Sequence, residues 1–405
     1  MLRDYDPSRD RSAALRMWRE VGWIGKESRD EVWLEFLEAG RGHVAELQGE
    51  PECLVVTMPA TMRYLTEDLP AAAITGVTTG LVARKQGFAK RLTARAVAAE
   101  AAAGALVITL SMFEQGFYDQ VGFGTGGYEL THSIDPAWLR VEGAFAVPRR
   151  LSCSDAPALH HGRLTRRRGH GGVNLLPLGA TRAELTESSG FGLGYGDPEL
   201  THALWLSHDQ AESGPYRVEW LFWREPGQLR ELLALLASLG DQIRLVTLRE
   251  PPGIQLQDLL KQPFQQQLAR ADSKYATRCT ASALYQHRLL DLPGCLARTR
   301  LPGPSVEFQL RLTDPIAAYL PADAPWRGVG GDYRVKLGAE SSAVPGHGSG
   351  QPLLEASVGA FTRLWLGAVS ASGLALTDDL RGPEELLAAL DVALRLPPPK
   401  PEWPY

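Results

Sequence analysis

Arg84, Gly87 and Ala89 follow the spacing R-x-x-G-x-A where the chain passes from an apolar strand into a helix. The strand is ITGVTT at residues 74–79, and an alanine-rich helix begins near residue 88. Glycine at such a turn lets backbone N–H groups approach an anion closely, and the helix directs the positive end of its dipole towards that anion. The turn therefore predicts a pyrophosphate site, with an ordinary helix start as the alternative.

Residues around this turn favour the same chemistry. Four basic residues can supply a local positive patch: Arg84, Lys85, Lys90 and Arg91. A second apolar strand, ALVITLS at 105–111, follows the helix, and the aromatic segment FEQGFYDQVGF comes directly afterwards. A strand, a basic turn, a helix and a second strand in this order outline a phosphate-binding α/β unit.

The composition limits the classes of protein that need to be considered. A chain of 405 residues predicts two or three domains of ~100–200 residues each. The hydrophobic content of 44% indicates a soluble globular protein, and the net charge of -5 gives no general attraction to nucleic acid or to a membrane. The charged start MLRDYDPSRDR lacks an apolar signal-peptide core, and the most apolar region divides into helix and strand. We therefore expect a cytoplasmic protein.

Cysteine and histidine are placed without a metal-binding pattern. The four cysteines lack a C-x-x-C spacing, which predicts buried or surface thiols in a reducing compartment: Cys53, Cys153, Cys279 and Cys295. His160, His161 and His170 have no carboxylate or thiol at ligand spacing, so we expect an exposed loop and no metal. The triplet Arg166–Arg168 lacks interleaved aromatic residues, which indicates a solvated loop and no nucleic-acid site.

Three successive domains are predicted, all of mixed α/β character. Residues 1–139 begin with helices near 12–21 and 29–37, continue with strands HVAEL, CLVVTM and ATMRYL, and then reach the anion turn. Residues 140–295 contain the helix LRELLALLASL followed by the strand IRLVTL, a step that repeats the first domain and suggests a divergent second copy. The stretch GFGLGYGDPEL is expected to be a loop, because its glycines do not follow a strand and open a helix.

The third predicted domain, residues 296–405, ends in an extended tail. It alternates strands VEFQLRL, DYRVKL and LLEASV with two later helices, and its last residues are LPPPKPEWPY. Prolines stiffen such a tail, which is usually either disordered or docked. Trp403 and Tyr405 favour docking, because exposed aromatic residues at a chain end are unfavourable.

Several longer segments together carry a resemblance to a known family. They are WIGKES at 23–28, MRYLTEDLPAAAITGVTT at 62–79, ARKQG at 83–87, FYDQVGFG at 117–124, KYATRCTASAL at 274–284 and TRLWLGAVSASGLA at 362–375. In this order and spacing the chain resembles the enhanced intracellular survival (Eis-like) family of GNAT N-acetyltransferases. The resemblance implies two tandem GNAT-like domains, a sterol carrier protein-like α+β domain, acetyl-CoA as co-substrate and a homo-oligomer, a hexamer.

Acetyl transfer to an amine needs a polarised thioester carbonyl, a neutral amine and an acid for the departing thiolate. By resemblance the backbone at Val77 and Thr79 contacts pantetheine, and the turn residues Arg84, Lys85, Gly87, Phe88 and Ala89 hold the rest of the cofactor. By resemblance Tyr118 has the position of the general acid. A phenol of pKa ~10 suits that role, because it is protonated at neutral pH. A core aromatic is the alternative.

The resemblance also implies a base and an acceptor site. The α-carboxylate of Tyr405 would return to the acceptor pocket as general base, with a frayed chain end as the alternative. Trp33 would line that pocket, although a tryptophan at helical spacing is equally typical of a core. The acceptor implied is a primary amine of a small molecule or a peptide.

The chain departs from the family at positions that concern the substrate. Gly22 and Pro404 stand where members that acetylate polycationic aminoglycosides carry acidic side chains, which weakens the case for a highly cationic acceptor. Compensation by the carboxylates of Glu402 and Asp68 is the alternative. At the turn, Leu81 replaces a proline and Gln86 a basic residue, changes that could lower CoA affinity. A catalytically degenerate protein, which binds ligands or assembles subunits through the sterol carrier-like domain, is the alternative function.

Overall fold

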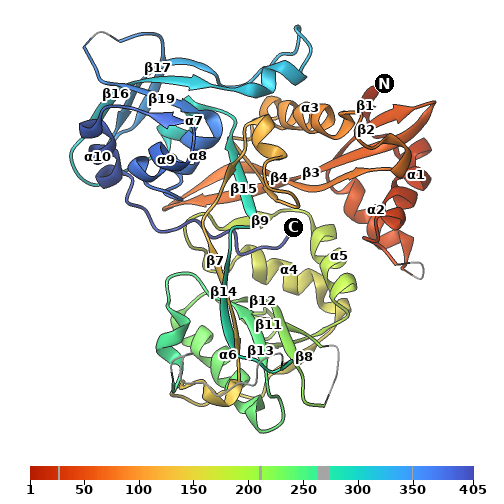
Figure 1. Cartoon of the computed structure of the whole chain (residues 1–405). Coiled ribbons are helices and arrows are strands. Elements are labelled where there is room, and N and C mark those ends of the chain that lie inside the picture. The colour runs from red at the N-terminus through yellow and green to blue at the C-terminus, as the bar shows by residue number, and fades with distance from the viewer. Residues whose placement is uncertain (26–27, 209–211, 263–272, 349) are drawn as a thin grey trace. The chain divides into compact units, whose positions relative to one another are not determined.

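The computed structural model of the protein describes residues 1–25, 28–208, 212–262, 273–348 and 350–405 (Figure 1). These residues form two compact units, each of which draws on separate parts of the chain. The first unit contains Met1–Gly127, His170–Leu176 and Ala283–Tyr405, and the second contains Tyr128–Gly169 and Pro177–Ser282. Mixed sheets with helices between the strands confirm the predicted α/β fold class.

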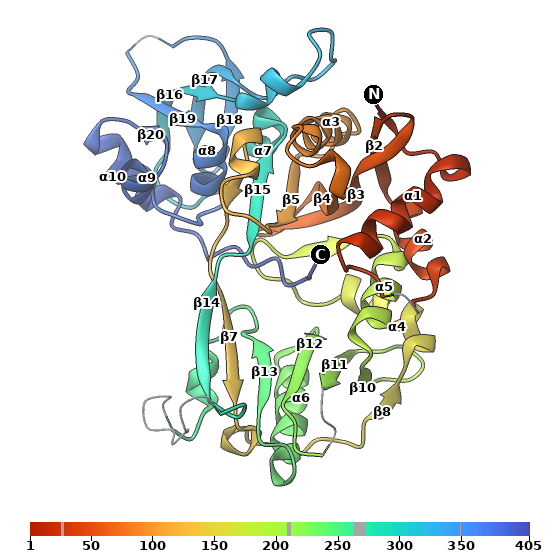
Figure 2. The ribbon, with the colours of Figure 1, turned by 45° about the vertical axis from the view of Figure 1, so that its right-hand side comes forward.

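A mixed sheet organises the amino-terminal part of the first unit. Its strands, in spatial order, are β1 (Leu2–Asp4), β2 (Arg41–Leu47), β3 (Glu50–Tyr64), β4 (Glu67–Thr79), β5 (Val107–Ser111), β15 (Tyr285–Leu289) and β6 (Gly124–Thr125), and β9 (Val173–Leu175) pairs with β3. β4 and β5 are parallel, whereas β15 is antiparallel to both of its neighbours. Figure 2 shows β15 beside β5, although β15 follows the second unit in sequence.

Three helices accompany this sheet. They are α1 (Pro7–Glu20), α2 (Asp30–Glu38) and α3 (Phe88–Ala102), close to their predicted positions. α3 buries Leu92, Ala96 and Val97 in the core, as the predicted helix requires. The strands expected at 53–58 and 60–65 are instead one strand, β3, because the fixed φ of Pro59 is compatible with an extended backbone.

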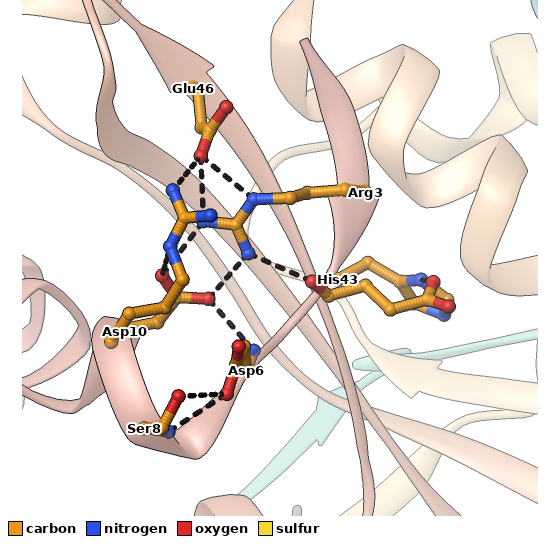
Figure 3. Close-up of polar contacts among 8 residues, drawn as sticks. Arg3, Asp6, Ser8, Asp10, His43 and Glu46 are labelled. Atoms are coloured by element: carbon orange, nitrogen blue, oxygen red, sulfur yellow. Dashed lines mark hydrogen bonds and ion pairs between the residues drawn. The ribbon is translucent and has the colours of Figure 1, made fainter.

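A network of ion pairs fastens β1 to α1 and β2 (Figure 3). Arg3 donates from Nη1 and Nη2 to the Asp10 carboxylate at 2.6 and 2.8 Å, and from Nε to Glu46 at 2.8 Å. The backbone N–H of Asp6 also donates to Asp10 at 2.8 Å. The Asp10 side chain is only 1% exposed, so these partners are what make its burial tolerable.

The second unit contains another mixed sheet. Its strands, in spatial order, are β14 (Arg278–Ser282), β7 (Glu129–Ile134), β13 (Val246–Arg249), β12 (Tyr216–Phe222), β11 (His202–His208), β10 (Phe191–Tyr195) and β8 (Arg149–Leu151). The helices are α4 (Ala156–Leu164), α5 (Leu178–Ser188) and α6 (Pro226–Ser238). This sheet repeats the connectivity of the first one. In both, an antiparallel pair of strands is followed by a helix and then by a strand parallel to the second of the pair: β11, β12, α6 and β13 here, and β3, β4, α3 and β5 in the first unit.

β10 corrects the expectation of a loop at GFGLGYGDPEL. Residues 191–195 pair with β8 on one side and with β11 on the other. A Cβ on Gly192 would lie 2.8 Å from a Leu151 atom and 2.9 Å from a Trp205 atom. The glycines therefore serve close packing inside a sheet, and the prediction of a loop was wrong.

Burial corrects part of the expectation of exposed histidines and a solvated arginine triplet: His161 and Arg167 are exposed, as expected, whereas His160, His170 and Arg166 are buried. His160 lies on α4, only 7% exposed, with Nδ1 2.9 Å from Thr181 Oγ1. His170 is buried in the first unit and contacts the Leu366 carbonyl and the Leu65 N–H. Arg166 is buried as well, and donates to the Arg163 carbonyl at 2.7 Å. Among the described residues no cluster of side chains could hold a metal ion.

The carboxy-terminal part of the first unit forms a smaller sheet. Its strands, in spatial order, are β18 (Ser342–Pro345), β17 (Gly331–Leu337), β16 (Val306–Thr313), β19 (Leu353–Ser357) and β20 (Leu380–Arg381), and its helices are α7 (Leu292–Ala297), α8 (Val358–Trp365), α9 (Ala371–Thr377) and α10 (Glu384–Ala393). Trp365 of α8 stacks on Tyr64 of β3 with 4.4 Å between the ring centroids. This stacking joins the smaller sheet to the larger one.

The compact units divide the chain differently from the predicted boundaries at 139/140 and 295/296. β7, expected to close the first domain, lies in the sheet of the second unit. Residues 283–295, expected in the second domain, belong to the first unit because β15 pairs with β5. No helix within the described ranges is long and apolar enough to cross a membrane.

Candidate active site

The turn before α3 is open. A 3₁₀ helix, Leu81–Ala83, ends β4, and the backbone then takes positive φ at Lys85 (62°) and Gly87 (74°). A Cβ built on Gly87 would meet no atom within 4 Å. The side chains of Arg84, Lys85 and Gln86 are exposed. Within the described parts of the chain, no atom therefore fills the space beside Gly87.

The first turn of α3 has no side-chain cap among the described residues. Gly87 is the N-cap but supplies no side-chain acceptor, and the first turn contains no acidic residue. The first N–H with a partner inside the helix is that of Arg91, which donates to the Gly87 carbonyl at 3.3 Å. The preceding amides, from Phe88 to Lys90, are the donors that a helix amino terminus normally leaves free for a cap or an anion.

The parallel strands β4 and β5 separate next to this turn. Ladder pairing joins Ala71–Ile74 to Val107–Leu110 and then stops, whereas β4 continues to Thr79. On the other side of β4 the register with β3 shifts at Thr75, so β4 bends there. Val77 and Thr79 lie in the segment that has no partner on β5, and this segment can direct backbone groups at a bound carbonyl.

Tyr118 is both a core residue and a protonated phenol. It begins a 3₁₀ helix, Tyr118–Val121, is only 7% exposed, and packs edge-on against Phe117 at 4.9 Å and Phe123 at 6.0 Å between ring centroids. Burial, together with the nearby charge of Glu114, raises the pKa of Tyr118 to about 12. None of the described residues forms a hydrogen bond with its hydroxyl, so the structure is compatible with either role.

The carboxy-terminal tail is docked, as the aromatic residues predicted. It runs from α10 back to the larger sheet, in dark blue in Figure 2. Trp403 is completely buried, and Tyr285 donates from its hydroxyl to the Trp403 carbonyl at 3.1 Å. The Val173 N–H donates to the Pro401 carbonyl at 2.9 Å. A frayed end is therefore inconsistent with the structure.

Tyr405 reaches the point at which β4 and β5 separate. Its hydroxyl lies 2.8 Å from Oγ1 of Thr109, which pairs with Ala73 next to the last β4–β5 pair. Ile108 and Leu110 face the core that contains Tyr118 and α3. Because side chains alternate along a strand, Thr109 points to the opposite face of the sheet. Tyr118, on the side of Ile108 and Leu110, and the Tyr405 hydroxyl, on the side of Thr109, thus lie on opposite faces of the sheet.

Trp33 is a core residue on α2. It is 8% exposed and packs against Trp18 and Phe36, each with 6.3 Å between ring centroids. Trp23, by contrast, is 44% exposed, and a Cβ on Gly76 of β4 would lie 3.5 Å from its ring. Trp23, rather than Trp33, therefore presents an accessible aromatic surface beside β4. Sequence reasoning found neither this role of Trp23 nor the contact of Thr109 with Tyr405.

Comparison with known families now identifies two parts of the chain. Residues 8–126 match the acetyltransferase (GNAT) domain, and residues 292–403 match the sterol carrier protein domain. The chain joins a GNAT acetyltransferase domain to a sterol carrier protein domain. This result confirms the predicted fold class and the predicted enzyme class, an N-acetyltransferase. No curated protein matches the sequence.

Solved structures extend the likeness beyond the two domains. A conserved protein of unknown function from Enterococcus faecalis has a TM-score of 0.80 at 16% identity, covering 100% of this chain and 99% of the other. Eis1 from Mycobacterium abscessus has a TM-score of 0.78 at 16% identity, covering 100% of both chains. A GCN5-related N-acetyltransferase from Kribbella flavida has a TM-score of 0.76 at 19% identity, covering 100% and 98%. The GNAT and sterol carrier protein domains therefore lie within an Eis1-like fold, as the resemblance predicted.

Proposed function

We propose that the chain transfers the acetyl group of acetyl-CoA to a primary amine of a small molecule or a peptide. The open, uncapped turn at Gly87, at the end of a strand that separates from its parallel neighbour, is the observation that carries the proposal. An anion-binding turn beside a gap between parallel strands suits a substrate with a pyrophosphate at one end and a thioester at the other.

Substrate binding follows from this geometry. The amides of Phe88, Ala89 and the following residue donate to the pyrophosphate, and the exposed Arg84 and Lys85 add positive charge. Lys90 and Arg91 contribute less, because Lys90 contacts Gln120 and Arg91 lies 5.2 Å from the centroid of the Phe88 ring. The backbone at Val77 and Thr79 aligns the pantetheine arm and polarises the thioester carbonyl. No metal ion takes part in the proposed reaction.

The reaction is a direct attack with an acid and a base on opposite faces of the sheet. The neutral amine forms the C–N bond as the C–S bond breaks, the amine proton passes to the main-chain carboxylate of Tyr405, and Tyr118 protonates the CoA thiolate. The high pKa of Tyr118 keeps the phenol protonated before each turnover. The alternation of side chains about Thr109 supports this division between the two tyrosines.

The acceptor carries little positive charge in this proposal. Gly22 and Pro404 provide no carboxylate where relatives that modify polycations have one, and each charge pair at such a site is worth ~1 kcal/mol or more. The exposed Trp23 offers an aromatic surface instead, which favours an acceptor with an apolar body and one amine. Trp18 packs against both Trp23 and Trp33, each with 6.3 Å between ring centroids, so Trp33 contributes to that surface through Trp18.

Release of CoA from acetyl-CoA in the presence of a panel of monoamines and polyamines tests the function. We expect turnover with apolar monoamines, and a fall of roughly 100-fold in kcat for Tyr118→Phe. Tyr333→Phe is the matched control, because it also removes a tyrosine hydroxyl, one that donates to the Val329 carbonyl at 2.8 Å in the sterol carrier protein domain. Equal losses in both variants would assign Tyr118 a purely structural role.

The alternative is a degenerate protein that binds ligands or assembles subunits through its sterol carrier protein domain. The packing of Tyr118 in the core is the observation that favours it. Calorimetry that detects no acetyl-CoA binding would support this alternative. The proposed assembly is a homo-oligomer, a hexamer by resemblance, in the cytoplasm, and light scattering of the purified protein measures its size.

A further inference from the structure

The hydroxyl of Thr109 lies at the centre of a hydrogen-bonded cluster. Its Oγ1 is 2.8 Å from the Tyr405 hydroxyl, 2.9 Å from His287 Nδ1 and 3.2 Å from the Gln286 carbonyl. Thr109 and His287 are directly paired across β5 and β15, and both are at least 99% buried. The cluster is therefore held by the sheet and not by the tail.

The donors and acceptors in this cluster can be assigned. Burial lowers the pKa of His287 to about 3, so the ring is neutral and carries one N–H. Its Nε2 has no partner among the described residues, and an unpaired buried acceptor is less costly than an unpaired buried N–H. The ring proton is therefore assigned to Nδ1, which donates to Thr109.

This assignment leaves one role for Tyr405. A threonine hydroxyl donates once and accepts twice. Thr109 accepts from His287 and donates to the Gln286 carbonyl, so its remaining lone pair accepts from the Tyr405 hydroxyl. The direction of the tyrosine proton is then fixed by two strands in the centre of the sheet.

Two of the contacts at the end of the tail are hydrogen bonds to the sheet, and they serve as anchors. The Trp403 carbonyl accepts from Tyr285, and the Tyr405 hydroxyl donates to Thr109, with Pro404 between them. Proline restricts φ, so fixing its neighbours on either side also fixes the main chain at residue 405. A phenylalanine at this position would keep the ring and the carboxylate but would lose the second anchor.

We propose that Thr109 is a positioning residue, which holds the main-chain carboxylate of Tyr405 in place through the tyrosine hydroxyl. This proposal rests on the proposed function, in which that carboxylate accepts the amine proton. A base that is free to move spends less time within reach of the amine, so loss of the anchor lowers kcat more than it raises the KM for acetyl-CoA.

Four variants of the full chain test the proposal: Tyr405→Phe, Thr109→Val, Thr109→Ser and deletion of Tyr405. We expect Tyr405→Phe and Thr109→Val each to lower kcat by about tenfold, the effect of losing one hydrogen bond that positions the base. The double variant should be no worse than either single variant, because both remove the same hydrogen bond. Thr109→Ser retains the hydroxyl and restores kcat. In the single variants the KM for acetyl-CoA stays within about twofold of the starting protein, because the turn at Gly87 is untouched.

The outcomes separate the two proposals. If deletion of Tyr405 leaves kcat and its pH profile unchanged, the carboxylate is not the base and the proposed mechanism fails. If the deletion lowers kcat but Tyr405→Phe does not, the carboxylate of Tyr405 remains the proposed base, but the positioning role of Thr109 is overturned. Hydrogen exchange at the Trp403 amide measures how firmly the tail is docked and does not depend on catalytic activity. We expect faster exchange in both Tyr405→Phe and Thr109→Val. Should Thr109→Val fail to fold, Tyr405→Phe alone decides, because it changes only the tail.

Discussion

Arg288 and Asp314 form a buried ion pair between β15 and the sterol carrier protein domain. Arg288 Nη2 lies 2.5 Å from Asp314 Oδ2, and the two side chains are 0% and 2% exposed. Arg288 also donates to the Val121 carbonyl at 2.8 Å, and Asp314 accepts from the Val329 N–H at 2.8 Å. One pair of side chains thus connects the acetyltransferase sheet, the segment after Tyr118 and the carboxy-terminal domain.

Removing one partner of this pair should strongly destabilise the protein. Asp314→Ala leaves the Arg288 guanidinium buried without its counter-charge, for which we expect a loss of ~3–5 kcal/mol in the free energy of unfolding. Urea denaturation measures the loss. Asp332→Ala is the control, since Asp332 pairs with Arg311 at the surface at 3.2 Å and should cost less than ~1 kcal/mol. Comparable losses in both variants would show that the buried ion pair contributes no more to the free energy of unfolding than a surface pair.

Gly122 makes the same region intolerant of a side chain. Its φ is +84°, and a Cβ would lie 1.7 Å from Arg288 Nη1 and 2.7 Å from Val358 Cγ1. Gly122→Ala should therefore lower the thermal midpoint far more than Gly104→Ala. Gly104 has φ of +92° with no atom within 4 Å of the added Cβ, so its substitution costs only left-handed strain, ~1–2 kcal/mol. Equal midpoints for the two variants would mean that Arg288 can move aside freely.

Asp10 should make stability depend on acid pH. Burial by itself would raise the pKa of Asp10, but hydrogen bonds from Arg3 and the Asp6 N–H, with the charges of Arg3 and Arg9, lower it overall. A carboxyl whose native pKa is depressed stabilises the fold above its unfolded pKa of ~3.9, and this contribution is lost as the pH falls towards the native pKa. The stability difference between the protein and Asp10→Asn should therefore be larger at pH 7 than at pH 3.

Chemical denaturation at both pH values measures this difference. Asp323→Asn is the control, because Asp323 is exposed and should change stability little at either pH. A stability difference for Asp10→Asn that is the same at pH 3 and pH 7 would contradict the assigned role of the Arg3 network.

Tyr118 should not limit catalysis in moderately alkaline solution. Because burial raises its pKa to about 12, the phenol stays protonated up to that range, and kcat should not fall between pH 8 and pH 10. Tyr118→Phe should lower kcat without changing the shape of the profile in that interval. The measurement is kcat against pH at saturating amine. A basic limb near pH 9 that disappears in Tyr118→Phe would mean that the native phenol titrates much lower.

The unit around the turn could be predicted because its signals are local. Strand β4, the basic turn, α3 and β5 follow one another directly, and apolar periodicity together with Gly87 marks each boundary. The docked tail was also predictable, because Trp403 and Tyr405 would be costly if exposed. Both predictions depend on residues close together in sequence.

Other parts of the site depend on pairing between distant segments. β15 lies beside β5 only in the folded sheet, so nothing near Thr109 in sequence indicates His287 or Tyr405 as neighbours. The strand β10 was missed for a related reason. Glycines in a sequence are typical of a loop, but here the side chain of Trp205, from another strand, occupies the space beside Gly192. Burial of His170 likewise depends on a carbonyl at Leu366.

The late arrival of β15 has a consequence for synthesis on the ribosome. β5 and β6 emerge early, but the strand that fills the space between them begins at Tyr285, after the whole second unit. At ~5–20 residues per second, the nascent chain carries two unpaired strand edges for roughly ten to thirty seconds. The acetyltransferase sheet is thus completed only after translation of the second unit. During that interval the unpaired strand edges are accessible to chaperones.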